Sequence, residues 1–286
     1  IIITLRQLIQ PETRASLLKL FPNWYLKLMK ICRFISKNSK DPQFGVLTDE
    51  LIEPISAGDV FAGNFQVGAA IGLSDARLLP PVSPSKIVCV GRNYAEHARE
   101  LGNEVPKEPL LFLKAPTSLI VGGEPIIIPP QSKQVEHEGE LAVVIGRIAK
   151  NLGENENPFD YIFGYACLND VTARDLQRKD VQFTRAKSFD TFCPVGTFVE
   201  TDLNPLNINL QVRVNGSLRQ SGNTNQMVFP IPELIRYISH QMTLLPGDLI
   251  ATGTPSGVGQ LKDGETVEVE IEGIGVLSNP VRKSEV

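Results

Sequence analysis

Residues 134–145 read QVEHEGELAVVI, and this stretch combines a strand of buried type with closely spaced carboxylates. The run that begins at Glu140 has apolar residues on both faces, which is typical of a strand covered on both sides. Because alternate residues of a strand share a face, Glu136, Glu138 and Glu140 are predicted to point the same way. Burying a carboxylate is costly unless a cation or hydrogen-bond donor pairs with it, so we expect cations beside this face. The alternative is a solvent-exposed strand edge.

The segments on either side of this stretch are mostly short and strand-like, and Gly or Pro separates nearly all of them. Helices are predicted only near RNYAEHAREL (92–101) and IPELIRYISHQ (231–241). This balance indicates an α+β fold that is mostly β and largely antiparallel, rather than a doubly wound sheet. The candidate strands are KIVCVG (86–91), LLFLK (110–114), SLIVG (118–122), PIIIP (125–129), ELAVVIG (140–146), YIFGYACLND (161–170), INLQVRVNG (208–216), DLIATG (248–253) and TVEVEIEG (266–273).

Composition and charge limit the classes of partner. The chain is 42% apolar and 21% charged, as in an ordinary globular protein, and it has no apolar run of the ~18 residues that a membrane helix needs. Residues 41–286 hold 20 basic and 31 acidic groups, which argues against nucleic acid as a partner. We expect no membrane contact, and a cytoplasmic location with reduced thiols, because the cysteines form no C-x-x-C pair. They are Cys32, Cys89, Cys167 and Cys193.

Three parts are expected along the chain. Residues 1–28 are basic and precede Met29, the first methionine, so we expect an extension outside the folded core that is disordered or not native. A weak transit-like peptide is the alternative for this segment. Residues 29–80 are predicted to form a small N-terminal subdomain. The proline-rich connector LLPPVSPSK (78–86) leads into the main domain, residues 81–286.

Three carboxylates suggest a metal site. Glu138 and Glu140 would share a strand face, and Asp170 ends the strand GYACLND. Three hard oxygen donors suit Mg²⁺ or Mn²⁺ and leave positions open for the oxygens of a substrate. His137 lies between the glutamates and should face the other way, so it is interpreted as a structural histidine.

A second candidate group lies on the first predicted helix. His97 and Glu100 are three residues apart, which places them on one helix face. A carboxylate that holds one imidazole nitrogen leaves the other free to accept a proton near neutral pH. An ordinary surface contact is the alternative, and a nearby divalent metal would favour the catalytic interpretation.

Two lysines and a glycine-rich loop complete the candidate chemistry. Lys114 ends a strand and Lys187 lies in a loop segment, where each could bind a substrate that carries carboxylates. The loop ATGTPSGVG (251–259) is not a phosphate-binding P-loop, because no Gly-Lys-Ser/Thr follows. Its glycines would let the backbone approach a small ligand, to which Thr254 could donate its hydroxyl; a plain turn is the alternative.

Taken together, these segments resemble the fumarylacetoacetate hydrolase family, from about Met29 to the C-terminus. The resemblance implies a mixed β-roll fold, a homodimer, one Mg²⁺ or Mn²⁺ per active site and a 2-oxo acid or diacid substrate. The branch it resembles most contains acylpyruvate hydrolases and 2-hydroxyhepta-2,4-diene-1,7-dioate isomerases. Six motifs occur in the family's order: IVCVGRNYAEHARELG (87–102), EGELAVVIG (138–146), GYACLNDVTARDLQ (164–177), AKSFDTFCPVG (186–196), VNGSLRQSGNT (214–224) and GDLIATGTPSGVG (247–259).

The resemblance also implies roles for single residues. The metal ligands would be Glu138, Glu140 and Asp170, while Glu136 would only flank them. The catalytic residues would be His97, Glu100 and Lys187, and the substrate-contacting residues would be Arg92, Tyr94, Lys114, Gln177 and Thr254.

The implied activity is metal-dependent hydrolysis of a C–C bond in 2,4-dioxo acids of the acylpyruvate or fumarylpyruvate type, in the catabolism of aromatic compounds. His97, oriented by Glu100, would deprotonate the attacking water, and the metal and Lys187 would stabilise a pyruvate enolate. The same enolate would also support oxaloacetate decarboxylation or isomerisation and tautomerisation of a 2-oxo diacid. A non-catalytic module that binds metal and a 2-oxo acid is a more remote alternative.

Overall fold

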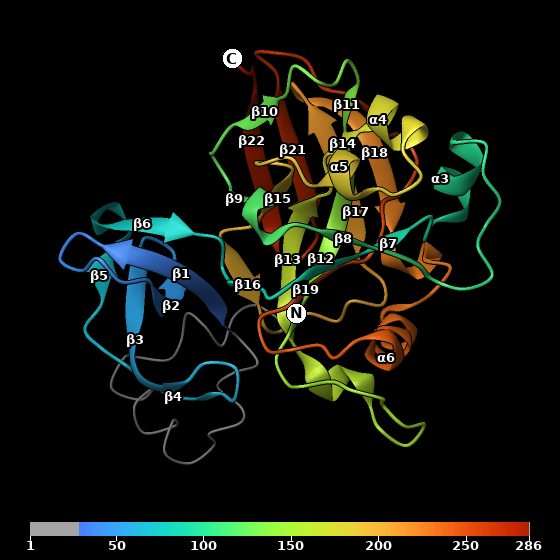
Figure 1. Cartoon of the computed structure of the whole chain (residues 1–286). Coiled ribbons are helices and arrows are strands. Elements are labelled where there is room, and N and C mark those ends of the chain that lie inside the picture. The colour runs from blue at the N-terminus through green and yellow to red at the C-terminus, as the bar shows by residue number, and fades with distance from the viewer. Residues whose placement is uncertain (1–28, 286) are drawn as a thin grey trace, which may run out of the picture.

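The protein forms a small all-β lobe beside a larger body, as a computed structural model that describes residues 29–285 shows (Figure 1). The extension predicted at residues 1–28 lies outside the described residues. No helix in the described range is both long and apolar enough to cross a membrane.

The small lobe is built around strand β1, which pairs with β2, β6 and, in the body, β16. The β1–β16 pairing places Lys30 opposite Glu200, so the sheet runs without a break from the lobe into the body. The lobe comprises β1 (Lys30–Ser36), β2 (Gln43–Thr48), β3 (Leu51–Asp59), β4 (Asn64–Val67), β5 (Ile71–Gly72) and β6 (Ala76–Leu79).

The body's main sheet continues from β16 through β13, β12, β19 and β7 to β8. Its pairings are antiparallel except for β19–β7 and β15–β9, which are parallel. Its strands are β7 (Ile87–Gly91), β8 (Leu110–Lys114), β9 (Leu119–Val121), β12 (Gly139–Ile145), β13 (Ile162–Asn169), β15 (Cys193–Val195), β16 (Phe198–Glu200) and β19 (Leu249–Ala251).

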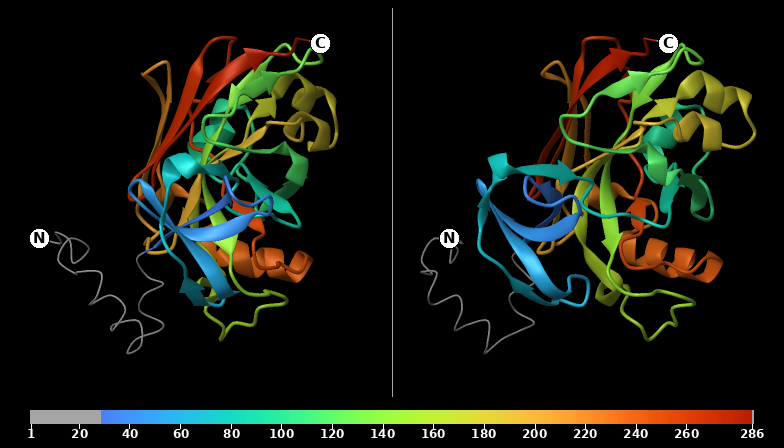
Figure 2. Two further views of the ribbon diagram at one scale, coloured as in Figure 1. Left: turned by 90° about the vertical axis from the view of Figure 1, so that its left-hand side faces the viewer. Right: turned by 60° about the vertical axis from the view of Figure 1, so that its left-hand side comes forward.

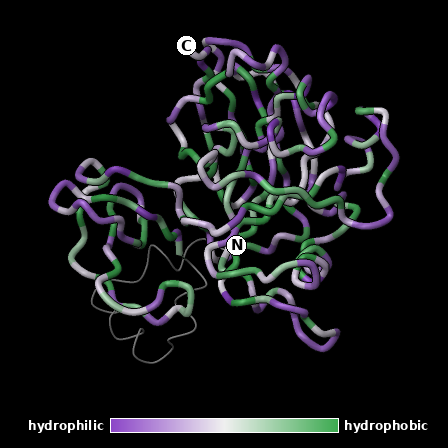
Figure 3. Tube along the Cα trace, in the orientation of Figure 1, coloured by the Kyte–Doolittle hydropathy of each residue, from purple (hydrophilic) through white to green (hydrophobic). Residues whose placement is uncertain are grey.

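Strand β12 is buried along its whole length because both of its faces are covered. Leu141, Val143 and Ile145 belong to the larger hydrophobic cluster, which includes the core of the five-stranded sheet described below. Ala142 and Val144 pack on the other side, in a cluster that also contains residues of the small lobe. Burying each large aliphatic side chain contributes about 1.5–3 kcal/mol, so this strand anchors the two halves of the core to each other. Figure 3 shows the hydrophobic segments inside the body and hydrophilic ones in its outer loops.

A second, five-stranded sheet packs over the end of β12 where the carboxylates begin. A Cβ at Gly139 would lie 2.3 Å from a methyl carbon of Val212 in this sheet, so only glycine permits the close approach. The sheet order is β10-β22-β21-β17-β18. Its strands are β10 (Ile126–Ile128), β17 (Asn209–Val214), β18 (Ser217–Asn223), β21 (Thr266–Ile271) and β22 (Gly275–Lys283).

The chain changes sheets at Glu138. The residues before it form β11 in a three-stranded sheet of order β14-β11-β20, and those after it form β12 in the main sheet. The single strand expected across the glutamates is therefore two short strands joined at a candidate metal ligand. The three-stranded sheet contains β11 (Val135–His137), β14 (Thr172–Ala173) and β20 (Gly259–Gln260).

Four α-helices in the described residues lie around these sheets. Helix α6 is at the opposite end of the body from the C-terminal strands, while α4 and α5 lie next to each other near the three-stranded sheet (Figures 1 and 2). The helices are α3 (Ala95–Glu100), α4 (Arg174–Lys179), α5 (Thr184–Lys187) and α6 (Ile231–Gln241), and the 3-10 turns are η2 (Leu73–Asp75), η3 (Pro116–Ser118), η4 (Pro158–Tyr161) and η5 (Thr224–Gln226).

The expected α+β fold with mostly β structure is confirmed, and so is the predominance of antiparallel pairing. The first predicted helix is shorter than expected at its start. Arg92 has a left-handed backbone (φ 58°), and the Asn93 side chain donates to the carbonyl oxygens of Phe229 and Thr252, so these residues precede α3 rather than belong to it. The helix ends at Glu100, and Gly102, two residues later, has the left-handed backbone (φ 69°) that commonly follows a helix.

Candidate metal centre

Three buried carboxylates come together at the point where the chain changes sheets. Oxygen atoms of Glu138, Glu140 and Asp170 all lie within 4.8 Å of one another, and each residue is less than 5% exposed. The register of β12 with β13 explains the cluster, because it places Gly139 opposite Asn169 and so brings Asp170 beside the two glutamates. Two hydrogen bonds fix this junction, from the Asp170 amide to the Glu138 carbonyl (2.8 Å) and from the Glu138 amide to Asn169 Oδ1 (2.9 Å).

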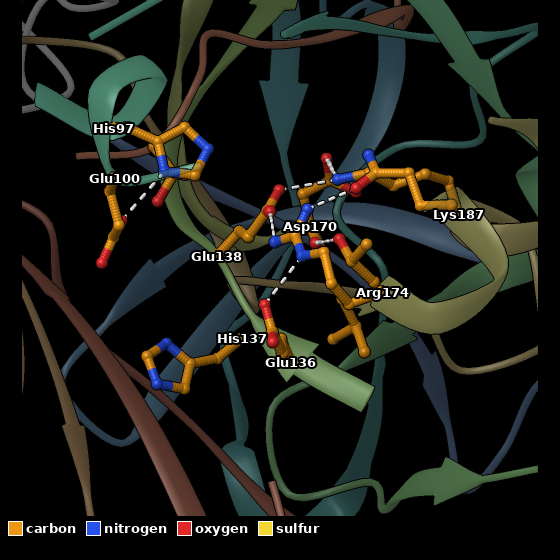
Figure 4. Close-up of polar contacts among 12 residues, drawn as sticks. His97, Glu100, Glu136, His137, Glu138, Asp170, Arg174 and Lys187 are labelled. Atoms are coloured by element: carbon orange, nitrogen blue, oxygen red, sulfur yellow. Dashed lines mark hydrogen bonds and ion pairs between the residues drawn. The ribbon is translucent and has the colours of Figure 1, made fainter. Parts of the chain in front are cut away.

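Buried cations neutralise two of these carboxylates. Lys187 Nζ donates to Glu138 Oε2 (2.6 Å) and to Asp170 Oδ2 (2.5 Å), and so bridges them (Figure 4). Lys114 Nζ donates to the other oxygen of Asp170 (2.7 Å), and Arg174 pairs with the other oxygen of Glu138. Burial alone would raise the pKa of Glu138, but Lys187 and Arg174 outweigh it and hold that pKa well below its usual range.

Glu140 has no cationic partner in the described part of the chain. Among the described residues, its carboxylate accepts one hydrogen bond, from the Gly253 amide to Oε2 at 2.7 Å. Burial, followed by the neighbouring charges of Asp170 and Glu138, raises the pKa of Glu140 well above its usual value. A divalent cation at this point would supply the positive charge that Glu140 lacks.

The donor set fits such a cation. All three residues offer carboxylate oxygens, which Mg²⁺ and Mn²⁺ prefer, and none offers the thiolate or imidazole of a zinc site. Glu136, expected to flank the ligands, accepts a hydrogen bond from Arg174 Nε (2.8 Å) and one from Gln134 Nε2 (2.6 Å). It lies in β11, before the chain turns into the main sheet.

His97 and Glu100 are held by α3 beside this cluster. The distance from His97 Nδ1 to Glu100 Oε2 is 3.4 Å, and the ring is 4% exposed. The same carboxylate accepts the Gly257 amide at 3.0 and 3.1 Å, which ties α3 to the glycine-rich loop. Gly257 has φ 99°, and a Cβ there would lie 2.1 Å from the Arg219 carbonyl oxygen, so this loop conformation requires glycine.

A cavity of about 350 Å³ opens over the carboxylates. Val90, Leu110, Phe112 and Phe183 supply apolar parts of its wall. Nine of the eleven residues that the sequence predicts for the site line this cavity: Arg92, His97, Glu100, Glu138, Glu140, Asp170, Gln177, Lys187 and Thr254.

The other two predicted residues, Lys114 and Tyr94, do not line this cavity. Lys114 is 1% exposed and reaches Asp170 from outside the cavity lining. Tyr94, 3% exposed, pairs through its backbone with Met227 and lines a different cavity, beside Pro255. Neither residue is among those that line the cavity over the carboxylates, and their roles in contacting the substrate stay predictions.

Sequence reasoning missed the part played by Gln220, which lies in β18 and is fully buried. Its Oε1 accepts from the Gly139 amide (3.0 Å) and lies 3.0 Å from His137 Nδ1. Its Nε2 donates to Thr254 Oγ1 and to the Pro255 carbonyl, both at 2.7 Å. This amide thus joins the ligand strand to the glycine-rich loop, although no local pattern marks it. Burial lowers the pKa of His137, in keeping with the structural role expected for it.

Arg174 was also underestimated. The sequence gives it no predicted role in the site, but its guanidinium group contacts Glu136, Glu138 and Gln177. Its place in the motif GYACLNDVTARDLQ, three residues before Gln177, is the signal that could have marked it.

The fold and the buried carboxylate trio fit a class of enzyme that binds a divalent cation. Residues 86–282 match the family described as fumarylacetoacetate (FAA) hydrolase C-terminal, and residues 29–81 match Rv2993c-like, N-terminal. The chain belongs to the fumarylacetoacetate hydrolase family.

Relatives carry several activities in their names. The mitochondrial oxaloacetate decarboxylase of Dictyostelium discoideum is 48% identical over 66% of this chain and 89% of its own. Oxaloacetate tautomerase YisK of Bacillus subtilis is 40% identical over 81% of this chain and 86% of its own. The crystal structure of 2-hydroxyhepta-2,4-diene-1,7-dioate isomerase from Mycobacterium marinum superposes with a TM-score of 0.81 at 40% identity, covering 90% of this chain and all of that one.

Proposed function

We propose that the chain binds Mg²⁺ or Mn²⁺ through Glu138, Glu140 and Asp170 and interconverts the keto and enol forms of a 2-oxo dicarboxylate such as oxaloacetate. The observation that carries this proposal is the buried carboxylate trio in one cavity with His97 and Lys187. When bound, the cation would act as a Lewis acid on the 2-oxo group. The relatives named as oxaloacetate tautomerase and decarboxylase favour this substrate.

His97 is the proton-transfer group of this mechanism. Glu100 orients the ring through Nδ1, which leaves Nε2 to remove a proton from C3 of the keto acid. The electron pair of the broken C–H bond forms the enolate, whose oxygen takes up a proton to give the enol. In the reverse direction the same ring returns the proton to C3.

The cations of the site stabilise the enolate and hold the substrate. Lys187 presents its ammonium group beside Glu138 and Asp170, where it would stabilise negative charge on the substrate oxygens. Arg92, Gln177 and Thr254 line the cavity and would contact the substrate. Lys114 and Tyr94 do not line the cavity, and Lys114 would orient Asp170 through its hydrogen bond. Decarboxylation would start from the keto form: cleavage of C3–C4 releases CO₂ and leaves its electron pair in the enolate of pyruvate, which takes up a proton at C3.

Hydrolysis of a C–C bond in a 2,4-dioxo acid is the second candidate, and the His97–Glu100 pair favours it. Here the ring would take a proton from water while the water oxygen attacks the distal carbonyl carbon. Cleavage of the C–C bond would leave a carboxylic acid and the pyruvate enolate, which takes up a proton.

A three-substrate comparison tests the proposal. The purified chain, with Mg²⁺, with Mn²⁺ and with EDTA, is assayed for oxaloacetate keto–enol exchange by ultraviolet absorbance, for CO₂ release from oxaloacetate, and for pyruvate release from acetylpyruvate. We expect metal-dependent exchange to be the fastest. Faster release of pyruvate would favour the hydrolase, and tight metal binding without turnover of any substrate would favour a binding module.

The preferred metal and the assembly belong to the same proposal. We infer a homodimer, which rests on the family resemblance and is tested by light scattering of the purified chain. The higher kcat/KM in the two metal series would identify the more effective ion.

A further inference from the structure

One face of helix α4 carries three side chains into the cavity. Arg174, Gln177 and Arg178 are spaced i, i+3 and i+4, so they share a face of the helix, and all three line the cavity. Lys179, the next residue, does not line it. Arg174 forms ion pairs with Glu136 and Glu138, so its charge is already balanced.

Arg178 differs from Arg174 because a neutral group holds it. Its terminal nitrogen donates to Gln134 Oε1 at 3.0 Å, and the Gln134 amide donates in turn to Glu136 at 2.6 Å. Within residues 29–285, Arg178 forms no ion pair with a carboxylate. A guanidinium group that is oriented by an amide keeps its full positive charge and several free donors.

The charge balance of the cavity indicates what this arginine is for. The lining holds four carboxylates, and its four cationic side chains are Arg92, Arg174, Arg178 and Lys187. Glu136 and Lys114, which are buried outside the lining, add one negative and one positive charge and so leave this balance unchanged. With every carboxylate ionised and a divalent cation bound, the cavity would carry two positive charges. A dianion neutralises them, whereas a monocarboxylate leaves one uncompensated.

We propose that Arg178 binds the second carboxylate of the substrate and selects 2-oxo dicarboxylates over 2-oxo monocarboxylates. This inference rests on the proposed function, since it assumes that the 2-oxo carboxylate end lies at the carboxylate trio. The planar guanidinium group pairs with a carboxylate through two parallel N–H donors, which gives geometric as well as electrostatic selection. Because Arg178 is at the exposed edge of the cavity, it meets the end of the substrate that is farther from the buried trio.

Oxaloacetate and pyruvate test this assignment, because they share the 2-oxo acid end and differ by the second carboxylate. The binding of each to the Mn²⁺-loaded protein is measured by calorimetry, together with oxaloacetate turnover. In Arg178→Met we expect oxaloacetate to bind about tenfold more weakly and pyruvate to be nearly unaffected. Arg178→Lys, which keeps the charge but not the paired donors, should lie between Arg178→Met and the unmodified protein.

Lys179→Met is the matched control, since it removes the same charge from the next residue of α4. It should change neither affinity by more than about twofold. If Arg178→Met weakens both ligands equally, weakens neither, or matches Lys179→Met, the assignment is wrong. Absence of turnover, with selectivity that still depends on Arg178, would overturn the proposed function while leaving the carboxylate assignment intact.

Discussion

The two sides of the cavity hold their carboxylates in opposite ways. On the side of α4 and α5, Glu138 is enclosed by side-chain cations, Lys187 and Arg174, which hold its pKa low. On the side of α3 and the glycine-rich loop, the carboxylates accept hydrogen bonds from backbone amides: Glu140 from Gly253, and Glu100 from Gly257. Only Gly139 separates Glu138 from Glu140, yet the charge of Glu138 is compensated by cations and Glu140 has a raised pKa.

This difference separates binding from proton transfer. The α4–α5 side presents fixed charge, which suits the binding of anionic oxygens without rearrangement. The α3 side presents His97 on a six-residue helix, tied to the loop through Glu100. Substitutions of His97 and Glu100 should therefore lower the rate, whereas substitutions of the carboxylate trio and of the cations on the α4–α5 side should weaken metal or substrate binding.

The largest effect should come from His97→Ala, on the proton-transfer side. Losing a positioned general base costs on the order of 10²–10⁴ in rate. We expect kcat to fall by this amount while the Mn²⁺ affinity, measured by calorimetry, stays unchanged. A variant that retains the full rate with metal bound would show that another group transfers the proton.

Glu140→Gln tests the metal site itself, because it removes the carboxylate of the trio that has no cationic side chain beside it among the described residues. Loss of a direct ligand should weaken Mn²⁺ binding on the order of 10²-fold. This is at or above the largest loss of metal affinity that follows when a group hydrogen-bonded to a ligand is replaced. Glu136→Gln is the matched control, because it removes the same charge two residues before Glu138 and should change metal affinity less. Equal effects of the two substitutions would contradict the ligand assignment.

Glu100→Gln should have a smaller effect, about tenfold or less in kcat. The amide can still accept from Gly257, so α3 stays tied to the loop, but it holds the His97 ring less strongly than a carboxylate does. Glu96→Gln, an exposed change on the same helix, should leave kcat unaltered.

The sequence predicted local features well and non-local ones poorly. Strands, the long helix α6 and the grouping of the three carboxylates follow from patterns within a few residues or from motifs of the family. The change of sheet at Glu138 depends on the packing of Gly139 against Val212, about 70 residues away in the chain. The Gln220 contacts likewise join segments that only tertiary structure brings together. Arg178 has no local signal either, because the residue that orients it, Gln134, lies 44 residues earlier in the chain.

The smallest effect we predict is a pH dependence of stability that belongs to Glu140 alone. Its folded-state pKa is raised, so its contribution to stability is complete below its unfolded pKa of about 4.3 and is lost as the pH rises through the folded value. Glu138 has a lowered pKa, so its contribution is present above its ordinary pKa and is lost only as the pH falls toward its folded value. Between pH 5 and 8, therefore, Glu140 rather than Glu138 should determine how the free energy of unfolding changes with pH.

In EDTA, the Tm of the unmodified protein should fall relative to that of Glu140→Gln by at least about 2 °C as the pH rises across this window. Excess Mn²⁺ should remove the fall, because a cation at the trio stabilises the ionised carboxylate in the folded state only. The measurement is a thermal unfolding series at matched ionic strength for both proteins. Parallel curves in EDTA would mean that Glu140 titrates normally, and the contrast between the two sides of the cavity would then lose its electrostatic basis.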